Sequence, residues 1–391
     1  MSEQSVMKGS EGPKARYPFH VLCKPIGPVC NLKCAYCFYL EKKVLYPRGE
    51  KWRMSDETLE AFVRQYIEMQ PEGAQEVNFA WQGGEPTLMG IDFFRKALAF
   101  QKQYARPGMQ ISNALQTNGT LLDDEWGAFL AENQFLVGIS IDGPADIHNH
   151  FRLDRVGEGT HDKVMQGLEI LKKHKVEFNA LVLVNCLNVK EPVKVYEFIK
   201  RRGVQFMQFI PLVEFVDHET GEIENERSIT AKEWGTFLNG VFDRWREKDI
   251  GRVFVQHFDM MLTILMGQPG ALCVHSRYCG RNVALEHNGD IYSCDHFVFP
   301  EWQLGNLTET PLSGMLDGEF QMKFGRDKSE TLPDVCRSCK YLNFCWGGCP
   351  NHRVETSSTG EPGLNRLCEG YKAFFSHTMP YFEAMGTCLQ L

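Results

Sequence analysis

The chain has 391 residues, of which 43% are hydrophobic and 24% are charged, so it has the composition of a globular protein of about two domains. Its formal net charge is −8 and no run of lysine or arginine stands out, which argues against nucleic acid as a partner, because phosphate binding requires a basic surface. No apolar stretch reaches the roughly 18 residues of a membrane span. Residues 1–17 are polar and predict a disordered lead-in without a secretory signal, so we expect a cytoplasmic protein.

From residue 18 to about 215, apolar runs of strand length alternate with amphipathic stretches of helical length. Ser55 is the expected N-cap of the first long helix. The expected strands cover 19–26, 76–84, 111–119, 135–143, 178–185 and 204–213, and the expected helices cover 56–70, 91–105, 161–174, 191–202 and a stretch from 123. Six strands joined by crossover helices predict a parallel sheet. We therefore expect an α/β fold whose first domain, over 18–250, is a partial (β/α)6 TIM-like barrel that is open at one side.

The alternating pattern ends after residue 215. A polar loop over 217–228 precedes two expected helices, at 230–248 and 254–267. From residue 270 onward the chain is rich in loops and cysteines and has few long periodic segments. Because such a stretch builds little core, we expect metal sites to stabilise a second, C-terminal domain over 251–391.

Fourteen cysteines are the feature of the composition that needs an explanation. A cytoplasmic compartment keeps thiols reduced, so cysteines at short spacings there are more often metal ligands than disulfides. Three of them, Cys30, Cys34 and Cys37, follow the first expected strand. Their spacing also fits one face of a buried helix, but the proline and glycine residues at 25–28 favour a loop.

Three thiolates at one place suit a metal centre with one open position. Thiolates select iron–sulfur clusters, zinc or Cu(I). A structural zinc site and an ordinary iron–sulfur cluster each use four protein ligands. With only three ligands, one metal atom keeps a position for a substrate or a cofactor.

The C-x3-C-x2-C spacing after a first strand, with Tyr36 before the last cysteine, resembles the radical S-adenosylmethionine enzymes. This resemblance implies a 4Fe–4S cluster whose open iron binds S-adenosylmethionine, and a 5′-deoxyadenosyl radical that abstracts hydrogen. The segment Gly83, Gly84, Glu85 and Pro86 resembles the motif that holds the amino group of the cofactor. The alternative for this segment is a glycine turn between a strand and a helix.

The same resemblance implies further cofactor contacts at the expected strand ends. Ser140 and Arg152 match positions that bind the ribose and the carboxylate, and a guanidinium suits a carboxylate as a bidentate donor. Tyr36 and Val213 would flank the adenine, Val213 by position only.

Eight later cysteines resemble the SPASM extension of radical enzymes that modify peptides. The resemblance implies two auxiliary 4Fe–4S clusters, and therefore three clusters in all. It assigns one to Cys273, Cys279, Cys294 and Cys349, and the other to Cys336, Cys339, Cys345 and Cys368. Two structural zinc sites are the alternative. Of the remaining cysteines, Cys23 and Cys186 read as small buried apolar residues, and the sequence assigns no role to Cys388.

The segment 288–307, in which Asp295 follows Cys294, resembles the anaerobic sulfatase-maturating enzymes. These enzymes oxidise a cysteine or serine of a sulfatase to Cα-formylglycine. The resemblance makes Asp295 the base that takes the thiol or hydroxyl proton beside an electron sink. The alternative is that Asp295 caps a turn. Tyr39 and Gln82 match positions that orient the target residue.

The partners implied are a sulfatase polypeptide and a reduced flavodoxin- or ferredoxin-type electron donor, with no nucleic acid and no membrane. Two other functions fit part of the pattern. One is another peptide modification by the same clusters, such as thioether or carbon–carbon crosslinking. The other is an iron–sulfur electron carrier, which would have no use for an open-site cluster.

Overall fold

The structure is a computed structural model that describes residues 13–217, 221–270 and 272–389. The chain divides into two compact units. The first contains residues 1–29, 44–114 and 280–324, and the second contains 30–43, 115–279 and 325–391. Most of the expected lead-in lies outside the described residues, and the expected domain boundary at 250 stays a prediction. Within the described ranges, no helix combines the length and the apolarity that crossing a membrane requires.

The first unit contains six strands in the order β12-β11-β10-β1-β2-β3, where β3 continues into the second unit. Its strands are β1 (His20–Lys24), β2 (Glu76–Trp81), β3 (Gln110–Thr117), β10 (Asn282–Glu286), β11 (Asp290–Tyr292) and β12 (Gln303–Asn306). Its helices are α1 (Asp56–Glu68), α2 (Ile91–Tyr104) and α9 (Leu312–Asp317), and α10 (Glu319–Glu330) crosses into the second unit. Strand β1 pairs in parallel with β2 and, on its other side, with β10.

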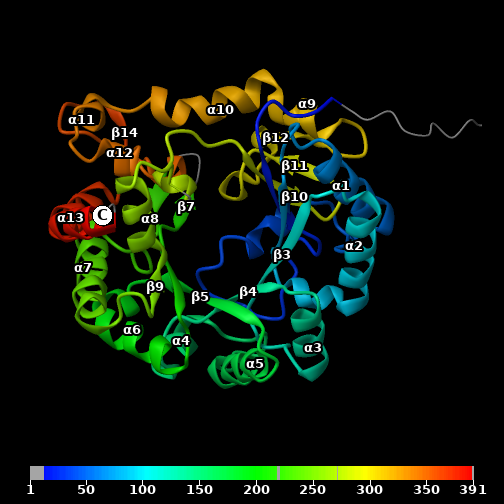
Figure 1. The fold of residues 1–391 in the computed structure, drawn as a ribbon, viewed down its shortest axis with the longest axis horizontal. Coiled ribbons are helices and arrows are strands. Elements are labelled where there is room, and N and C mark those ends of the chain that lie inside the picture. Colours follow the sequence, from blue (N-terminus) through cyan, green and yellow to red (C-terminus); the bar gives the residue numbers. More distant parts are fainter. Residues whose placement is uncertain (1–12, 218–220, 271, 390–391) are drawn as a thin grey trace, which may run out of the picture. The chain divides into compact units, whose positions relative to one another are not determined.

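The second unit contains strands in the order β4-β5-β6-β9, and the pairs β4·β5, β5·β6 and β6·β9 are parallel. These strands are β4 (Leu136–Ser140), β5 (Glu177–Val184), β6 (Phe206–Pro211) and β9 (Phe254–Val255). Two short hairpins pair β7 (Phe215–Asp217) with β8 (Glu222–Ile223) and β13 (Glu355–Thr356) with β14 (Pro362–Leu364). The helices are α3 (Asp124–Glu132), α4 (Ala145–Phe151), α5 (His161–Lys173), α6 (Pro192–Arg201), α7 (Ala231–Lys248), α8 (Gln256–Leu265), α11 (Asp334–Arg337), α12 (Leu342–Cys345) and α13 (Cys368–Leu389). In Figure 1 helices α4 to α7 lie outside strands β4 to β6.

All six predicted strands are present, and local sequence signals explain where their crossover helices begin. Ser55 caps α1 as predicted, because its hydroxyl accepts a hydrogen bond from the Thr58 amide at 3.1 Å. Helix α7 begins at a capping box that Thr230 and Glu233 form. The predicted helix over 254–267 is wrong at its start, where Phe254 and Val255 form strand β9 before α8 begins.

The expectation of few periodic segments after residue 270 was wrong for α10 and above all for α13, which is 22 residues long. Glycine and proline normally interrupt a helical pattern, and α13 contains both. Gly370 is required by packing, since a Cβ there would lie 2.2 Å from the Ala231 carbonyl oxygen of α7. A residue that indicates a helix break in the sequence therefore marks a close contact between two helices in the fold.

Candidate functional site

The loop with the first three cysteines belongs to the second unit and contains no helix between Cys30 and Cys37. The alternative of one buried helical face is therefore wrong. The loop is held by backbone hydrogen bonds from the Lys33 and Ala35 amides to the carbonyls of Leu153 and Phe151, at 2.8 and 3.1 Å. Arg155 adds a hydrogen bond from its Nε to the Cys30 carbonyl oxygen at 2.8 Å.

The three thiols lie close enough to influence one another. Burial, with a smaller contribution from the neighbouring thiols of Cys37 and Cys30, raises the pKa of Cys34 to about 12, although Arg152 opposes this shift. A thiol with such a pKa stays neutral at pH 7 unless a metal holds it as a thiolate. The closeness of the three thiols, and the need of the Cys34 thiol for a metal to become a thiolate, agree with the predicted cluster loop.

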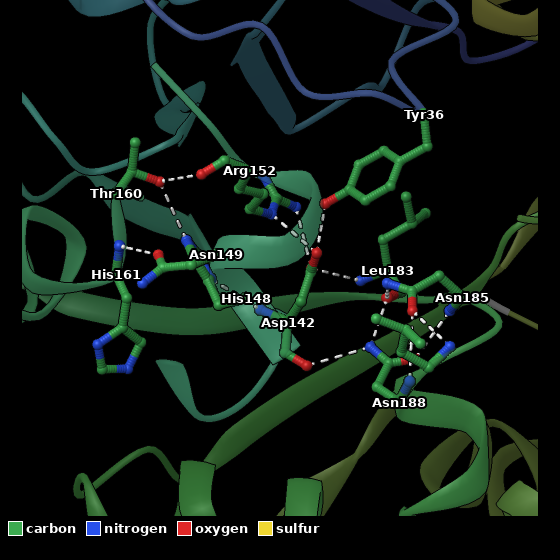
Figure 2. A network of polar contacts seen from close by, with 11 residues as sticks. Tyr36, Asp142, His148, Asn149, Arg152, Thr160, His161, Leu183, Asn185 and Asn188 are labelled. Atoms are coloured by element: carbon green, nitrogen blue, oxygen red, sulfur yellow. Dashed lines mark hydrogen bonds and ion pairs between the residues drawn. The ribbon is translucent and has the colours of Figure 1, made fainter. Parts of the chain in front are cut away.

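The carboxylate of Asp142 is the centre of a buried polar network next to this loop (Figure 2). It faces the Arg152 guanidinium, with Nε 3.0 Å from Oδ2 and Nη2 3.1 Å from Oδ1, and it accepts a short hydrogen bond from the Tyr36 hydroxyl. The Asp142 side chain is 1% exposed and that of Arg152 is 11% exposed. The Leu183 amide donates to Oδ1 at 3.3 Å. Two predicted cofactor contacts, Tyr36 and Arg152, are thus fixed by one carboxylate.

A second layer of hydrogen bonds holds the backbone around Asp142. Its amide donates to Nδ1 of His148 at 3.3 Å, and its carbonyl oxygen accepts from Nδ2 of Asn188 at 3.1 Å. The Thr160 hydroxyl donates to the Arg152 carbonyl oxygen at 2.8 Å (Figure 2). Burial lowers the pKa of His148 to about 3, so this imidazole is neutral and adds no charge to the network.

Sequence reasoning missed Asp142. The signal that could have found it is its place two residues after Ser140, at the end of β4, where the carboxyl ends of parallel strands gather functional groups. Ser140 is itself buried at that strand end. Val213 is buried just after β6, whereas the residue that packs in one cluster with Tyr36 and Phe151 is Leu212.

In the first unit, the Gly83–Pro86 segment follows β2 and packs against the end of β1. Gly83 has φ +119°, a conformation that favours glycine. A Cβ at Gly84 would lie 2.0 Å from the Val29 carbonyl oxygen, so Gly84 permits the close approach of two backbones. The buried carboxylate of Glu85 accepts hydrogen bonds from the Thr87 amide and hydroxyl at 3.0 and 2.6 Å. The segment is a tight turn, and its role toward the cofactor stays a prediction.

Asp295 lies in the first unit, at the start of a 3₁₀ turn that follows Cys294. Its Oδ1 forms an ion pair with Nζ of Lys24, the last residue of β1. The Lys24 side chain is 2% exposed and that of Asp295 is 21% exposed. The carboxylate is therefore partly accessible to a substrate, and its ion pair with a buried ammonium fixes its orientation.

The two predicted target-orienting residues belong to different units. Tyr39 is buried in the cysteine loop of the second unit, and Gln82 is half-buried after β2 in the first. The Gln82 amide donates to the Cys23 carbonyl oxygen at 2.9 Å, which fixes its backbone at the end of β1. Cys23 itself is fully buried within β1, as predicted for a small apolar residue, whereas Cys186 is only half-buried, contrary to the same prediction.

The structure brings together the four cysteines of one predicted auxiliary site, which line a single cavity with Tyr371 and Lys372. These four are Cys336, Cys339, Cys345 and Cys368. Of the other set, Cys273 and Cys279 lie near Cys349, whose pKa burial and these two thiols raise to about 12. Cys294 belongs to the first unit. Within the described residues no group of cysteine, histidine and carboxylate side chains is arranged to hold a single metal ion. The support for an iron–sulfur cluster is therefore the cavity that Cys336, Cys339, Cys345 and Cys368 line together.

Two family models match the chain in the regions that carry these cysteines. The model of the radical SAM superfamily matches residues 25–199. The SPASM model, described as an iron-sulfur cluster-binding domain, matches residues 273–340.

Curated relatives and a solved structure match nearly the whole chain. A serine-type anaerobic sulfatase-maturating enzyme of Bacteroides thetaiotaomicron is 44% identical over 380 residues, which cover 94% of this chain and 91% of the relative. A cysteine-type anaerobic sulfatase-maturating enzyme of Clostridium perfringens is 36% identical over 366 residues, which cover 93% of this chain and 97% of the relative. The solved structure of native anSMEcpe with bound AdoMet and the Cp18Cys peptide is 35% identical, with a TM-score of 0.84 over 95% of this chain and 99% of that one.

Proposed function

Because this chain belongs to the anaerobic sulfatase-maturating enzymes of the radical S-adenosylmethionine superfamily, we propose that it oxidises a cysteine or serine of a sulfatase to Cα-formylglycine. The predicted fold, a partial barrel followed by an iron–sulfur SPASM domain, is confirmed. The observation that carries the proposal is the Cys294–Asp295 pair, in which a predicted cluster ligand precedes a carboxylate that Lys24 holds in place. Simple electron transfer has no requirement for this base, and a crosslinking enzyme need not share the Cys–Asp pair.

Its cofactors are S-adenosylmethionine and 4Fe–4S clusters. When bound, they supply a 5′-deoxyadenosyl radical that removes a hydrogen atom from the Cβ of the target residue. Cys30, Cys34 and Cys37 would hold the cluster that binds S-adenosylmethionine, as their spacing and their place in one loop support. The eight later cysteines would hold the two auxiliary clusters.

Each of the remaining residues would contact a different chemical group of S-adenosylmethionine. Arg152 would bind its carboxylate, Ser140 its ribose and Glu85 its amino group, with Gly83 and Gly84 shaping the turn before Glu85. Tyr36 and Val213 would flank its adenine. The support for Arg152 is its fixed orientation, since Asp142 holds two of its three guanidinium nitrogens and leaves the third without a carboxylate partner among the described residues.

Asp295 would accept the proton of the target thiol or hydroxyl at its carboxylate. Lys24 supports this role, because the ion pair limits the rotation of the carboxylate. Tyr39 and Gln82 would orient the target residue.

The partner that the proposal requires besides the sulfatase is a reduced flavodoxin- or ferredoxin-type electron donor. We also assign the protein to the cytoplasm, since the thirteen cysteines from Cys23 to Cys368 are free thiols and such clusters need a reducing compartment.

The decisive experiment replaces Asp295 by asparagine, which keeps size and most hydrogen bonding but cannot take the proton. With reduced enzyme, S-adenosylmethionine and a sulfatase peptide bearing either cysteine or serine, Asp295→Asn should still form 5′-deoxyadenosine. Formylglycine, measured by mass spectrometry, should fall by a factor on the order of 10². The matched control is Glu301→Gln at an exposed position nearby, which should leave both products unchanged. Full clusters with a near-normal formylglycine yield in Asp295→Asn would remove this residue from the mechanism.

Iron analysis tests the clusters independently of activity. Three 4Fe–4S clusters predict about 12 iron atoms per chain after anaerobic reconstitution. Replacement of Cys30, Cys34 and Cys37 together by alanine should abolish cleavage of S-adenosylmethionine and leave roughly two-thirds of the iron, because the auxiliary sites have their own ligands. About four iron atoms with stoichiometric zinc in the unaltered protein would contradict the two auxiliary clusters.

A further inference from the structure

Lys328 on α10 is a buried cation among the cysteines of the second unit. Its side chain is 1% exposed. The Nζ donates hydrogen bonds to the carbonyl oxygens of Val274, at 3.3 Å, and Ser276. Both carbonyls belong to the short segment between Cys273 and Cys279, so the ammonium is attached to the backbone that presents these two thiols.

Arg353 repeats this arrangement on the next cysteine segment. Its Nη2 and Nε donate to the carbonyl oxygens of Trp346 and Gly347, at 2.7 and 3.1 Å. These carbonyls lie between Cys345 and Cys349. Each cation is therefore held against the main chain that connects two predicted cluster ligands.

Neither cation has an acidic partner to compensate its charge. Among the described residues, no carboxylate forms an ion pair or a hydrogen bond with Lys328 or Arg353. Burial lowers the pKa of Lys328 to about 8, and the groups that raise it again are the thiols of Cys279, Cys273 and Cys349. Burial likewise lowers the pKa of Arg353, and nearby thiols, Cys336 foremost, oppose this. Lys328 is fully buried and Arg353 is partly buried, and a buried cation without an anion is costly, so the folded protein needs negative charge at this place.

A cluster with four thiolate ligands supplies that charge. It is anionic when oxidised, and one-electron reduction adds a further negative charge. A fixed cation nearby stabilises the reduced form more than the oxidised form and so raises the reduction potential. Charge and hydrogen bonding around the ligands are among the ordinary determinants of such potentials.

We propose that Lys328 and Arg353 are built-in counter-cations of the two auxiliary clusters and raise their reduction potentials so that they accept the electron leaving the substrate. This inference rests on the proposed function. The oxidation removes two electrons and two protons from the target residue. One electron and one proton leave together as the hydrogen atom, the second proton goes to Asp295, and the second electron goes to an auxiliary cluster. For a serine target this gives the aldehyde directly, whereas a cysteine target gives a thioaldehyde, which water hydrolyses to the aldehyde with release of H2S.

The test is a redox titration of the reconstituted full-length protein, followed by electron paramagnetic resonance. The variant without Cys30, Cys34 and Cys37 identifies which signal belongs to the open cluster. Lys328→Met removes the charge, Lys328→Gln keeps a donor for the two carbonyls, and Lys328→Arg keeps the charge. The matched control is Lys323→Met, an exposed lysine of the same helix.

We expect both uncharged variants to retain full iron and to lower the potential of one auxiliary cluster, while Lys328→Arg and the control keep it. Arg353→Met should lower an auxiliary potential in the same direction. Loss of auxiliary iron in the uncharged variants but not in Lys328→Arg also supports the charge role. Unchanged potentials with full iron would overturn the inference, as would loss of iron in all three Lys328 variants. A low iron content in the unaltered protein would instead refute the cluster assignment itself.

Discussion

Replacing Asp142 by alanine should destabilise the protein more than any surface change, because its carboxylate is the only acidic group that contacts the Arg152 guanidinium within the described residues. Both side chains are nearly inaccessible, at 1% and 11% exposed. Removal of one partner from such a pair leaves an uncompensated charge and costs about 3–5 kcal/mol. The Tyr36 hydroxyl would also lose its acceptor. Asp142→Asn keeps an acceptor for Tyr36, so its loss should lie near the lower end of this range.

Anaerobic urea unfolding, followed by far-ultraviolet circular dichroism, measures the change as a shift of the midpoint at constant slope. Hydrogen exchange adds a local measure at Leu183, whose amide donates to the lost carboxylate. The matched control is Asp146→Asn on α4. Its ion pair with Lys194 has a similar length, 2.8 Å, but the side chains are 64% and 45% exposed. Such a pair contributes about 0–1 kcal/mol.

The same Asp142 variants should bind S-adenosylmethionine more weakly, because Arg152 and Tyr36 lose the group that fixes them. The predicted role of Asp142 is refuted if the free energy of unfolding of Asp142→Ala lies less than about 1 kcal/mol below that of Asp146→Asn, since a buried pair would then behave as an exposed one. It is also refuted if the Leu183 amide keeps its protection while the cofactor binds normally.

Two further variants probe the first unit. Lys24→Met should leave 5′-deoxyadenosine formation intact and lower the formylglycine yield by about 10- to 10²-fold, because Asp295 loses the ion pair that orients it, and Lys24→Arg should restore part of the yield. An equal fall of both products would show that Lys24 is only structural. Gly84→Ala should lower thermal stability and open-cluster iron, because its Cβ would lie 2.0 Å from the Val29 carbonyl oxygen. Gly314→Ala, with no neighbour within 4 Å, is the control, and equal melting temperatures of the two variants would contradict this account.

The six strands and most of their helices were predictable because their signals are local. Strands buried on both faces read as apolar runs, and a cap such as Ser55 lies within three residues of the amide that it binds. Two of the further strands, which pair in parallel with predicted ones, had no such signal. Strand β9 is two residues long, and β10 is recognised only through its parallel pairing with β1.

The candidate site was also predictable only in part. The first three cysteines could be identified as metal ligands because they lie at short spacings within one loop, and their metal preference follows from the thiolate itself. Asp142 has partners at positions 36, 152 and 183, and Lys328 has carbonyl partners more than fifty residues away. The place of Asp142 at a strand end could have indicated a functional residue, but most of these partners are distant in the sequence and are brought together only by the fold.

The pairing of β1 with β10 has a consequence for how the protein is made. During synthesis, β1 leaves the ribosome early, but one of its two neighbours, residues 282–286, follows only after most of the barrel helices. An apolar strand with an unpaired edge is a template for aggregation. Chains that are terminated before residue 282 would keep this edge unpaired permanently, even if their cysteines bound metal. Nascent chains of this protein therefore depend on protection of their first strand until residue 286 has emerged.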